Sequence, residues 1–493
     1  MHIARLDLGG KLTAFCLMAA AVALCQDALK PDLVLTGVIT GADHHTYREV
    51  PFRVPDGISR LTVEFSYSGR DQRTTIDLGI FDGERFRGWS GGNKSTFTIS
   101  ATDATPSYLA GPVQAGEWKL LLGIPNIRPG VRSEFEAKIY FVRSGAAERF
   151  SSVPINPAAG WYRGDLHMHT AHSDGSCSSQ SGKPVPCPVF KTLEAAANRG
   201  LDFIAVTDHN TVSQFDSLRE LQPYFDRLLL IAGREITTFE GHANVYGATG
   251  FIDFRLTSPQ VPTVKALLDQ ARALHALISI NHPANASGES CMGCGWTARD
   301  TDFREIQAIE AINAGDAGGP TSGIPFWEAQ LNRGFRLTAI GGSDNHHADV
   351  LNSASSIGHP TTVVYARDLS ESGVLDGVRS GRVFIDAEGA KGRMLDLSAT
   401  IGSTAVHMGD EVKAVKGAVL RFSVQVAAPA GSIVEVIEDG HKAEVVPDTA
   451  MTQAEETKNF DWTSDGARHW LRVNVRSPEG RLLSLGNPIY VNF

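Results

Sequence analysis

The middle of this chain repeats one local pattern, in which a helical stretch, closed in most cases by glycine, is followed by a fully apolar run. Glycine can take the left-handed conformation that ends a helix, and a strand that is apolar at every position has to be covered on both faces. The helical stretches and the apolar runs together predict β–α units around a buried parallel sheet, as in an α/β barrel or a close relative. The helical stretches are 189–200, 261–276, 325–334 and 370–381.

The two flanking regions have a different pattern. Residues 31–150 alternate short β-rich runs with turn residues, which predicts a β-sandwich or jelly-roll domain. The β pattern returns in 390–493 and predicts a second, small β-rich domain with a sandwich-like fold. The α/β pattern occupies the region between them, residues 160–386.

Residues 1–25 have the features of a secretory signal peptide. Arg5 and Lys11 precede an apolar run that is too short to span a bilayer and is followed by polar residues. We therefore expect a secreted or periplasmic protein. A lipoprotein anchor at Cys25 is the lesser alternative, because Leu24 is larger than the residue expected before a lipidated cysteine. No other stretch is long enough for a transmembrane helix.

Four cysteines follow the signal segment, in two local pairs with the spacings C-x9-C and C-x2-C. In an oxidising compartment these spacings favour two loop disulfides. A four-cysteine zinc site is the alternative. The residues concerned are Cys177, Cys187, Cys291 and Cys294.

The composition is that of an ordinary globular protein, with 42% hydrophobic and 20% charged residues. The formal net charge of −10 gives no broad positive field, so nucleic acid is not the expected partner. A small molecule is the expected substrate. The sequence does not indicate an oligomeric state.

Potential metal ligands follow the apolar runs of the middle region. In the segment "HMH", His167 and His169 point to the same side of an extended chain and could bind one cation. Single residues of this kind often have an ordinary structural role. The carboxyl ends of parallel strands meet at one face, however, so residues that follow several strands should converge there. A metal cluster is therefore expected.

These residues lie in motifs that resemble a known family. The segments "DLHMHTAHSDG", "TDHN", "GREITT", "GHANVYG", "NHPA" and "GGSDNH" are similar, in this order, to the motifs of the PHP (polymerase and histidinol phosphatase) superfamily. The resemblance covers about residues 160–386, and its wording is closest to the CehA/McbA group of metallohydrolases. It implies a distorted (β/α)7 barrel that holds two or three divalent ions, as zinc, manganese or iron.

The resemblance also implies which residues bind these ions. One ion would be held by His167, His169, Glu235 and Asp344, and a second by Glu235, His242 and His282, with Glu235 as the bridge. Asp174, His209 and His346 would hold the third, although His172 could replace Asp174. The donor set of histidine nitrogen and carboxylate oxygen suits borderline divalent ions.

Four further residues are candidates for catalysis. Asp208 could orient a ligand histidine or cap the following turn. Arg234 and His347 could bind the substrate or protonate the leaving group, although Arg234 could equally pair with an acidic residue. The fourth is His172. In the loop 288–296, Trp296 could wall the pocket or simply pack.

The function predicted is a secreted metal-dependent hydrolase that uses a metal-bridging hydroxide, a phosphoesterase acting on a small phosphate ester. The alternative is a carbamate or carboxylic ester hydrolase, as in the CehA/McbA group. An exonuclease and a non-catalytic metal-binding module are lesser alternatives. A phosphate pocket would use Arg234 and Arg163, whereas an apolar pocket would use Trp296, Phe326 and Trp327.

Overall fold

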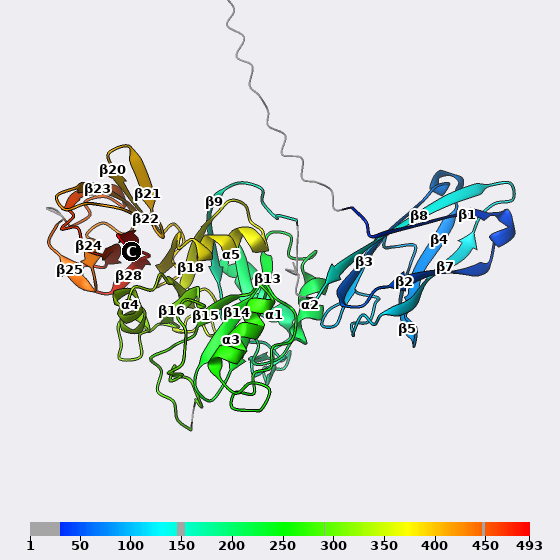
Figure 1. Ribbon diagram of the computed structural model, residues 1–493, viewed down its shortest axis with the longest axis horizontal. Coiled ribbons are helices and arrows are strands. Elements are labelled where there is room, and N and C mark those ends of the chain that lie inside the picture. Colours follow the sequence, from blue (N-terminus) through cyan, green and yellow to red (C-terminus); the bar gives the residue numbers. More distant parts are fainter. Residues whose placement is uncertain (1–29, 145–152, 290, 446–448) are drawn as a thin grey trace, which may run out of the picture.

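The structure, a computed structural model, describes residues 30–144, 153–289, 291–445 and 449–493. The expected signal segment, 1–25, lies outside the described residues. Figure 1 shows three parts along the long axis of the molecule: β-strands at the amino-terminal end, an α/β part in the middle, and further β-strands at the carboxyl-terminal end. In the part of the chain that the structure describes, no helix has the length and apolar character needed to cross a membrane.

The amino-terminal part consists of two four-stranded antiparallel sheets that share one core. Side chains alternate between core and solvent along these strands, so that Trp118, Leu120 and Leu122 are buried every second residue. Each such side chain contributes about 1.5–3 kcal/mol by burial. The first sheet has the order β1 (Leu33–Thr40), β8 (Arg132–Arg143), β3 (Ile58–Tyr67), β6 (Thr96–Ser100), and the second β2 (Thr46–Val54), β7 (Gly116–Asn126), β4 (Thr75–Phe81), β5 (Phe86–Gly91).

The central sheet is built from the predicted apolar strands. All four residues of β12 are buried, as expected for a strand covered on both faces. The strands, in sheet order, are β17 (Thr338–Gly342), β16 (Ala308–Asn313), β15 (Leu277–Ile280), β14 (His242–Tyr246), β13 (Leu229–Thr237), β12 (Phe203–Val206), β9 (Gly160–Asp165), β18 (Thr361–Ala366) and β19 (Val383–Asp386). A short ribbon of β10 (Ser176–Ser178) and β11 (Pro184–Pro186) follows β9.

The four predicted helices are confirmed, and the structure adds one more. Gly200 ends the first helix with φ at 77°, a left-handed value that a side chain would resist, which is why glycine is needed there. The additional helix, α2, lies beside β3 of the amino-terminal part in Figure 1. The helices are α1 (Val189–Arg199), α2 (Gln214–Leu221), α3 (Val264–Ala273), α4 (Ile324–Asn332) and α5 (Glu371–Arg379).

The predicted closed barrel is not found among the described residues. The strand order runs from β17 to β19 without a backbone ladder between β17 and β18, although the two lie side by side. The hydroxyl of Thr362 takes the place of the ladder, because its Oγ1 accepts from Gly341 N at 2.8 Å and donates to Gly341 O at 2.7 Å. The sheet is also mixed, since β14 and β18 run antiparallel to their neighbours.

The carboxyl-terminal strands continue the central sheet. β28 pairs with β19, so the described sheet has 15 strands in all. A separate four-stranded sheet packs on this extension over a shared apolar core. The extension contains β28 (Leu482–Gly486), β27 (His469–Arg476), β24 (Ile433–Glu438), β25 (His441–Ala443), β29 (Ile489–Val491) and β22 (Glu411–Val412), and the separate sheet β21 (Thr404–His407), β20 (Met394–Ile401), β23 (Val419–Ala427) and β26 (Glu455–Thr463).

Candidate metal centre

The segments that follow the central strands are tied together at one edge of the sheet. Asp344 N donates to His167 O at 2.9 Å, and His169 N donates to Asn345 O at 2.9 Å, which joins the segment after β9 to the segment after β17. His242 arrives at the same edge as the first residue of β14, because this strand runs antiparallel to its neighbours. The backbone thus brings distant histidines and carboxylates to one place.

Glu235, a fully buried residue of β13, lies at the centre of this group. Its Oε1 is 3.3 Å from His242 Nδ1 and 3.3 Å from His282 Nε2. Its Oε2 is 3.4 Å from His167 Nε2 and 3.5 Å from His169 Nε2. His209 Nδ1 is also 2.9 Å from Oε2. One carboxylate therefore faces five histidines, with its two oxygens toward different ones, which is the geometry expected of a bridging residue.

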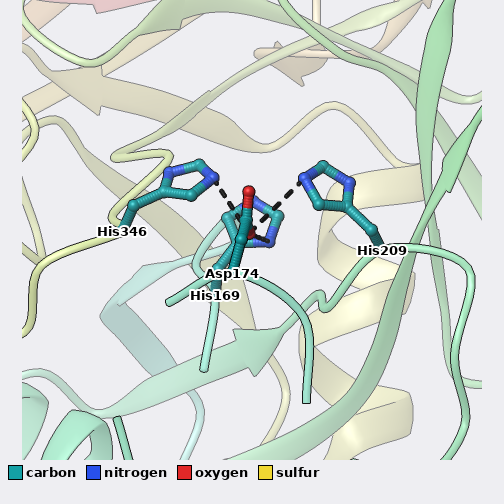
Figure 2. A group of neighbouring side chains, drawn as sticks. All are labelled: His169, Asp174, His209 and His346. Carbon is teal, nitrogen blue, oxygen red and sulfur yellow. Dashed lines mark ion pairs between the residues drawn. The ribbon is translucent and has the colours of Figure 1, made fainter. Parts of the chain in front are cut away.

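A further group of side chains lies on the solvent side of Glu235. Figure 2 shows His169, Asp174, His209 and His346 pointing toward one another. Asp174 Oδ1 is 3.3 Å from His346 Nε2 and 3.7 Å from His209 Nε2. The Asp174 side chain is 58% exposed, whereas that of Glu235 is fully buried, so the centre opens to solvent on this side.

Asp174 and His172 were the two candidates to complete this group, and the structure places Asp174 in it. His172 points elsewhere, with its Nδ1 2.7 Å from Ser213 Oγ, and it belongs to none of the groups of neighbouring ligand atoms among the described residues. The structure thus brings together all nine predicted ligands and leaves His172 aside. Whether the nine bind ions stays a prediction.

The hydrogen bonds around the centre orient the imidazole rings. His167 Nδ1 donates to Glu310 Oε1 at 3.0 Å, and His346 Nδ1 donates to the carbonyl oxygen of Asp344 at 2.8 Å. Since one nitrogen of each ring carries the proton of such a bond, the Nε2 atom of both rings faces the centre with its lone pair. Metal-binding histidines are held in this way by an acceptor on their other nitrogen.

Several buried atoms at the centre make no hydrogen bond. Within the described residues, His167 Nε2, His242 Nδ1 and Glu235 Oε2 are buried and have no hydrogen-bond partner. Burying polar atoms without a partner costs about 1–3 kcal/mol each. Divalent cations would supply the missing interactions of all three, so the residues present fit such ions.

The pKa values show how strongly the histidines and carboxylates of the centre interact. Burial by itself would lower the pKa of His346, but the carboxylates of Asp174 and Asp344 overcome it and raise this pKa to about 9. Burial would raise the pKa of Glu235, and His167 and other neighbouring histidines bring it well below its usual value. The field that holds a proton on His346 would equally hold a cation in its place.

Two of the predicted ligands have an uncommon backbone conformation. Asp344 has φ at 51° and His282 has φ at 27°, in the left-handed region that non-glycine residues rarely occupy. The backbone N of His282 donates to Glu310 Oε2 at 2.9 Å, which helps to hold it there. Strain of this kind persists where the surroundings impose it and is common at functional sites.

Glu310 on β16 is the main residue at the centre that the sequence interpretation missed. It is buried, and its two oxygens accept from His167 Nδ1 and His282 N. A second support is Asn281, whose Nδ2 donates to Glu235 Oε1 at 2.9 Å. The available signal was a carboxylate inside the apolar run 308–312, where a charged residue needs a reason to be buried.

Asp208 contacts none of the ligand histidines by a hydrogen bond given in the structure. Its Oδ2 accepts from Thr170 Oγ1 at 2.7 Å, and its Oδ1 accepts from Thr170 N and Ser173 Oγ, each at 2.7 Å. Asp208 therefore fixes the turn before Asp174. None of these bonds caps the segment that follows Asp208 itself. The prediction that Asp208 orients a histidine directly is replaced by this indirect role.

The two arginines predicted for a phosphate pocket lie away from the centre. Arg234 precedes Glu235 on β13, and since successive side chains of a strand point to opposite faces, it is buried on the other face, where its Nη2 donates to Gly250 O. Burial lowers the pKa of Arg234 to about 10. Arg163 pairs with Asp386 at 2.5 Å.

His347 lies next to the centre, and its Nδ1 is hydrogen-bonded to Ser176 Oγ. It is exposed and joins none of the groups of ligand atoms found in the described chain. Of the aromatic residues predicted for an apolar pocket, Trp327 is buried in the core with its Nε1 bonded to Leu337 O. Trp296 does lie beside the centre, packed against Gly241, the residue before His242.

Both predicted local disulfides are present. Cys177 is bonded to Cys187, and Cys291 is bonded to Cys294. The alternative of one zinc site formed by all four cysteines is therefore wrong. The first disulfide spans the ribbon of β10 and β11, and the second closes a loop beside His242 and His282.

The fold and the site together define an α/β protein with a histidine- and carboxylate-rich centre at one edge of a mixed sheet. No family model matches the chain, and no curated protein matches it either. The solved structures that are similar to it include two with low TM-scores. The case for a metal centre rests on the contacts within this chain.

The first is a two-domain protein from Bacteroides vulgatus that contains a predicted PHP-like metal-dependent phosphoesterase. It has a TM-score of 0.38 and 18% identity, and the match covers 70% of this chain and 99% of that one. The second is a proposed metal-dependent phosphoesterase from Bifidobacterium adolescentis. It has a TM-score of 0.29 and 11% identity, and the match covers 43% of this chain and 94% of that one.

Proposed function

We propose that this protein is a divalent-metal-dependent hydrolase of small phosphate esters. The observation that carries the proposal is the set of buried atoms around Glu235 that make no hydrogen bond, contributed in the described chain by Glu235, His167 and His242. Histidine nitrogen combined with carboxylate oxygen suits zinc, manganese or iron. Such ions would supply Lewis-acid chemistry and an activated water at neutral pH.

The residues of this chain would prepare the site for that reaction. Glu310 and Asn281 orient His167 and Glu235, so that the ligand atoms are in place before a substrate arrives. The exposed side chain of Asp174 marks the open side of the centre, where a substrate can enter. The buried side, around Glu235, excludes water from the back of the site.

The positions of the two arginines predicted for a phosphate pocket bear on the substrate. Arg234 is buried on the other face of β13, and Arg163 pairs with Asp386. The negative charge of a phosphate ester would therefore be neutralised by the bound cations themselves. A compact phosphate group in contact with two or more ions satisfies this requirement without Arg163 or Arg234.

Apolar side chains near the opening favour a second candidate, the hydrolysis of an apolar carbamate or carboxylic ester. Phe239 is 85% exposed and Met292 is 69% exposed. They lie on adjacent loops, since a Cβ on Gly293 would come within 2.9 Å of Phe239 Cα. These side chains would contact an aryl group, whichever ester it carries.

Export is part of the proposal. The apolar segment 12–25 and the two basic residues before it support a secreted or periplasmic location. The two disulfides are consistent with an oxidising compartment.

The test compares 1-naphthyl phosphate with 1-naphthyl N-methylcarbamate, using the mature protein loaded with manganese or zinc. Both release the same naphthol, so one fluorescence signal ranks the two reactions. Faster hydrolysis of the phosphate is expected. Faster hydrolysis of the carbamate would replace the first candidate by the second, and hydrolysis of neither would contradict the proposal.

A double variant, His167→Asn with His169→Asn, shows whether the centre carries the activity. We expect it to remove both the bound metal and the hydrolysis. The matched control replaces two exposed histidines of the amino-terminal part, His44→Asn with His45→Asn, and should retain both. Full activity in the first variant would overturn the assignment of the site.

A further inference from the structure

The loop closed by Cys291 and Cys294 contacts two ligand histidines through its backbone. His242 Nε2 donates to Met292 O at 3.2 Å, and His282 Nδ1 donates to Cys294 O at 3.1 Å. Because a carbonyl oxygen only accepts, these two nitrogens carry the ring protons. His242 Nδ1 and His282 Nε2, the nitrogens that face Glu235, are thereby left with their lone pairs.

The loop cannot easily move away from the histidines in its present form. Gly293 has φ at 76°, and a Cβ on it would lie 2.1 Å from Thr238 O, so only glycine fits between the two backbones. The disulfide closes the loop on the other side. Together these features position the carbonyls of Met292 and Cys294.

The sulfur of Cys294 lies close to two of the predicted ligand histidines. Cys294 Sγ and one ring nitrogen each of His242 and His282 are all within 4.8 Å of one another, and all three residues are buried. Cys291, by contrast, is exposed. A sulfur in a disulfide is a poor ligand, whereas a thiolate binds zinc and similar ions strongly.

We propose that the Cys291–Cys294 disulfide is a redox switch on the metal centre, in which reduction frees Cys294 to join His242 and His282 as a ligand. This proposal concerns regulation and rests on the proposed function for its effect on hydrolysis. In the oxidised form the sulfur is withheld and the centre keeps positions open for water and substrate. In the reduced form an added thiolate closes the centre, as in structural metal sites.

The chemistry requires a two-electron reductant, and a dithiol is one class that supplies the electrons. One thiolate of the dithiol attacks the exposed Cys291 sulfur, the bond to Cys294 breaks, and Cys294 leaves as a thiolate. The second thiol of the reductant then displaces Cys291, so the reductant becomes a disulfide and the protein holds two reduced cysteines. Cys294 would then meet the metal already as a thiolate, and the two protons released to solvent are those of the dithiol.

The other disulfide is a natural comparison. Neither Cys177 nor Cys187 belongs to a group of neighbouring ligand atoms in the described residues. Both are buried, and no exposed sulfur is available for attack in that bond. Its reduction should therefore leave the metal centre unchanged.

The experiment uses the full mature protein loaded with cobalt(II), because a thiolate bound to this ion gives an intense sulfur-to-metal absorption band in the near ultraviolet. The reductant is a phosphine, which carries no sulfur of its own, and alkylation followed by mass spectrometry shows which cysteines are free. We expect the band to appear when Cys291 and Cys294 are reduced. Hydrolysis should fall by about 10- to 100-fold, as when the hydrogen-bond partners of ligand histidines are disturbed.

Three variants separate the cysteines. Cys291→Ser should show the band without any reductant, because Cys294 is then permanently free. Cys294→Ser should never show it. The double variant Cys177→Ser with Cys187→Ser should behave as the unmodified protein, with the band appearing only on reduction.

Two outcomes would overturn the switch: no band although alkylation finds Cys294 free in the unmodified protein, or a band of equal strength in Cys294→Ser. The first needs no variant, so a variant that fails to fold leaves the test intact. Failure of the proposed function gives a different result. In that case the band appears on reduction, but the oxidised protein hydrolyses neither naphthyl ester.

Discussion

The metal centre and the contact between the amino-terminal part and the central part both bury carboxylates, but they treat them differently. Asp103 is fully buried and accepts from Arg60 at 2.7 and 2.9 Å, from Ser100 at 2.7 Å and from Arg219. Glu235 is equally buried, yet its Oε2 has no hydrogen-bond partner within the described residues. The arginines neutralise the charge of Asp103. The geometry around Glu235 instead suits a bound cation.

This difference distinguishes a cluster with a structural role from the candidate metal centre. At Asp103 the opposing charges come from two parts of the chain far apart in sequence, so the cluster fastens β3 to α2. At Glu235 the surrounding groups are histidines. Their ring nitrogens and the carboxylate could all bind a cation. The following predictions test whether the two clusters can be separated by experiment.

The largest effect is expected from Glu235→Gln. The amide keeps the size of the side chain but removes the charge that two groups of histidines share. Bound metal measured by elemental analysis should be lost, and hydrolysis should fall by at least about 100-fold, beyond the range seen for indirect supports of metal ligands. Retention of metal at the level of the unmodified protein would contradict the role of Glu235.

Asp103→Asn should give the opposite result. Removing one partner of a buried ion cluster costs about 3–5 kcal/mol, because Arg60 and Arg219 both lose the carboxylate that lies between them. The free energy of unfolding, measured in urea, should fall by this amount. Metal content and activity of the folded protein should not change; a loss of metal would show that the two clusters are coupled.

The stability contributed by Asp103 should depend on pH. Burial alone would raise its pKa, but the arginines lower it to about 2 in the folded protein. A carboxylate with a lowered pKa stabilises the fold above its unfolded pKa, about 3.9, and this contribution is lost as the pH falls toward 2.

The free energy of unfolding of the unmodified protein, measured relative to that of Asp103→Asn, should therefore fall by about 2 kcal/mol between pH 4 and 2. The measurement is urea unfolding of both proteins over this pH range. A constant difference between them would show that Asp103 is not the group that titrates.

Glu310→Gln should have the smallest effect. The amide can still bond to His167, but it no longer favours the tautomer that leaves Nε2 free for a cation. Metal affinity should fall by about tenfold, at the lower end of the effects of such partners, while unfolding in the metal-free form changes little. An effect as large as that of Glu235→Gln would show that Glu310 binds the metal directly.

The sequence predicted the local elements and the chemistry of the strand ends. Four helices were expected from their patterns and are present, and the two local cysteine pairs form disulfides. Glu310 escaped notice because a single carboxylate in an apolar run carries no periodic signal. The placement of Arg234 followed from strand alternation, but only once Glu235 was known to face the centre.

By itself, the sequence determined where helices and strands form and which of their ends carry metal-binding groups, because these depend on short-range periodicity, turn residues and side-chain chemistry. Tertiary structure decided the rest. β17 and β18 have no backbone ladder because the Thr362 hydroxyl hydrogen-bonds to both N and O of Gly341. The pairing of β28 with β19 was also decided at this level. The antiparallel β14 brought His242 to the centre. Strand direction and pairing depend on contacts between distant segments, which no local pattern encodes.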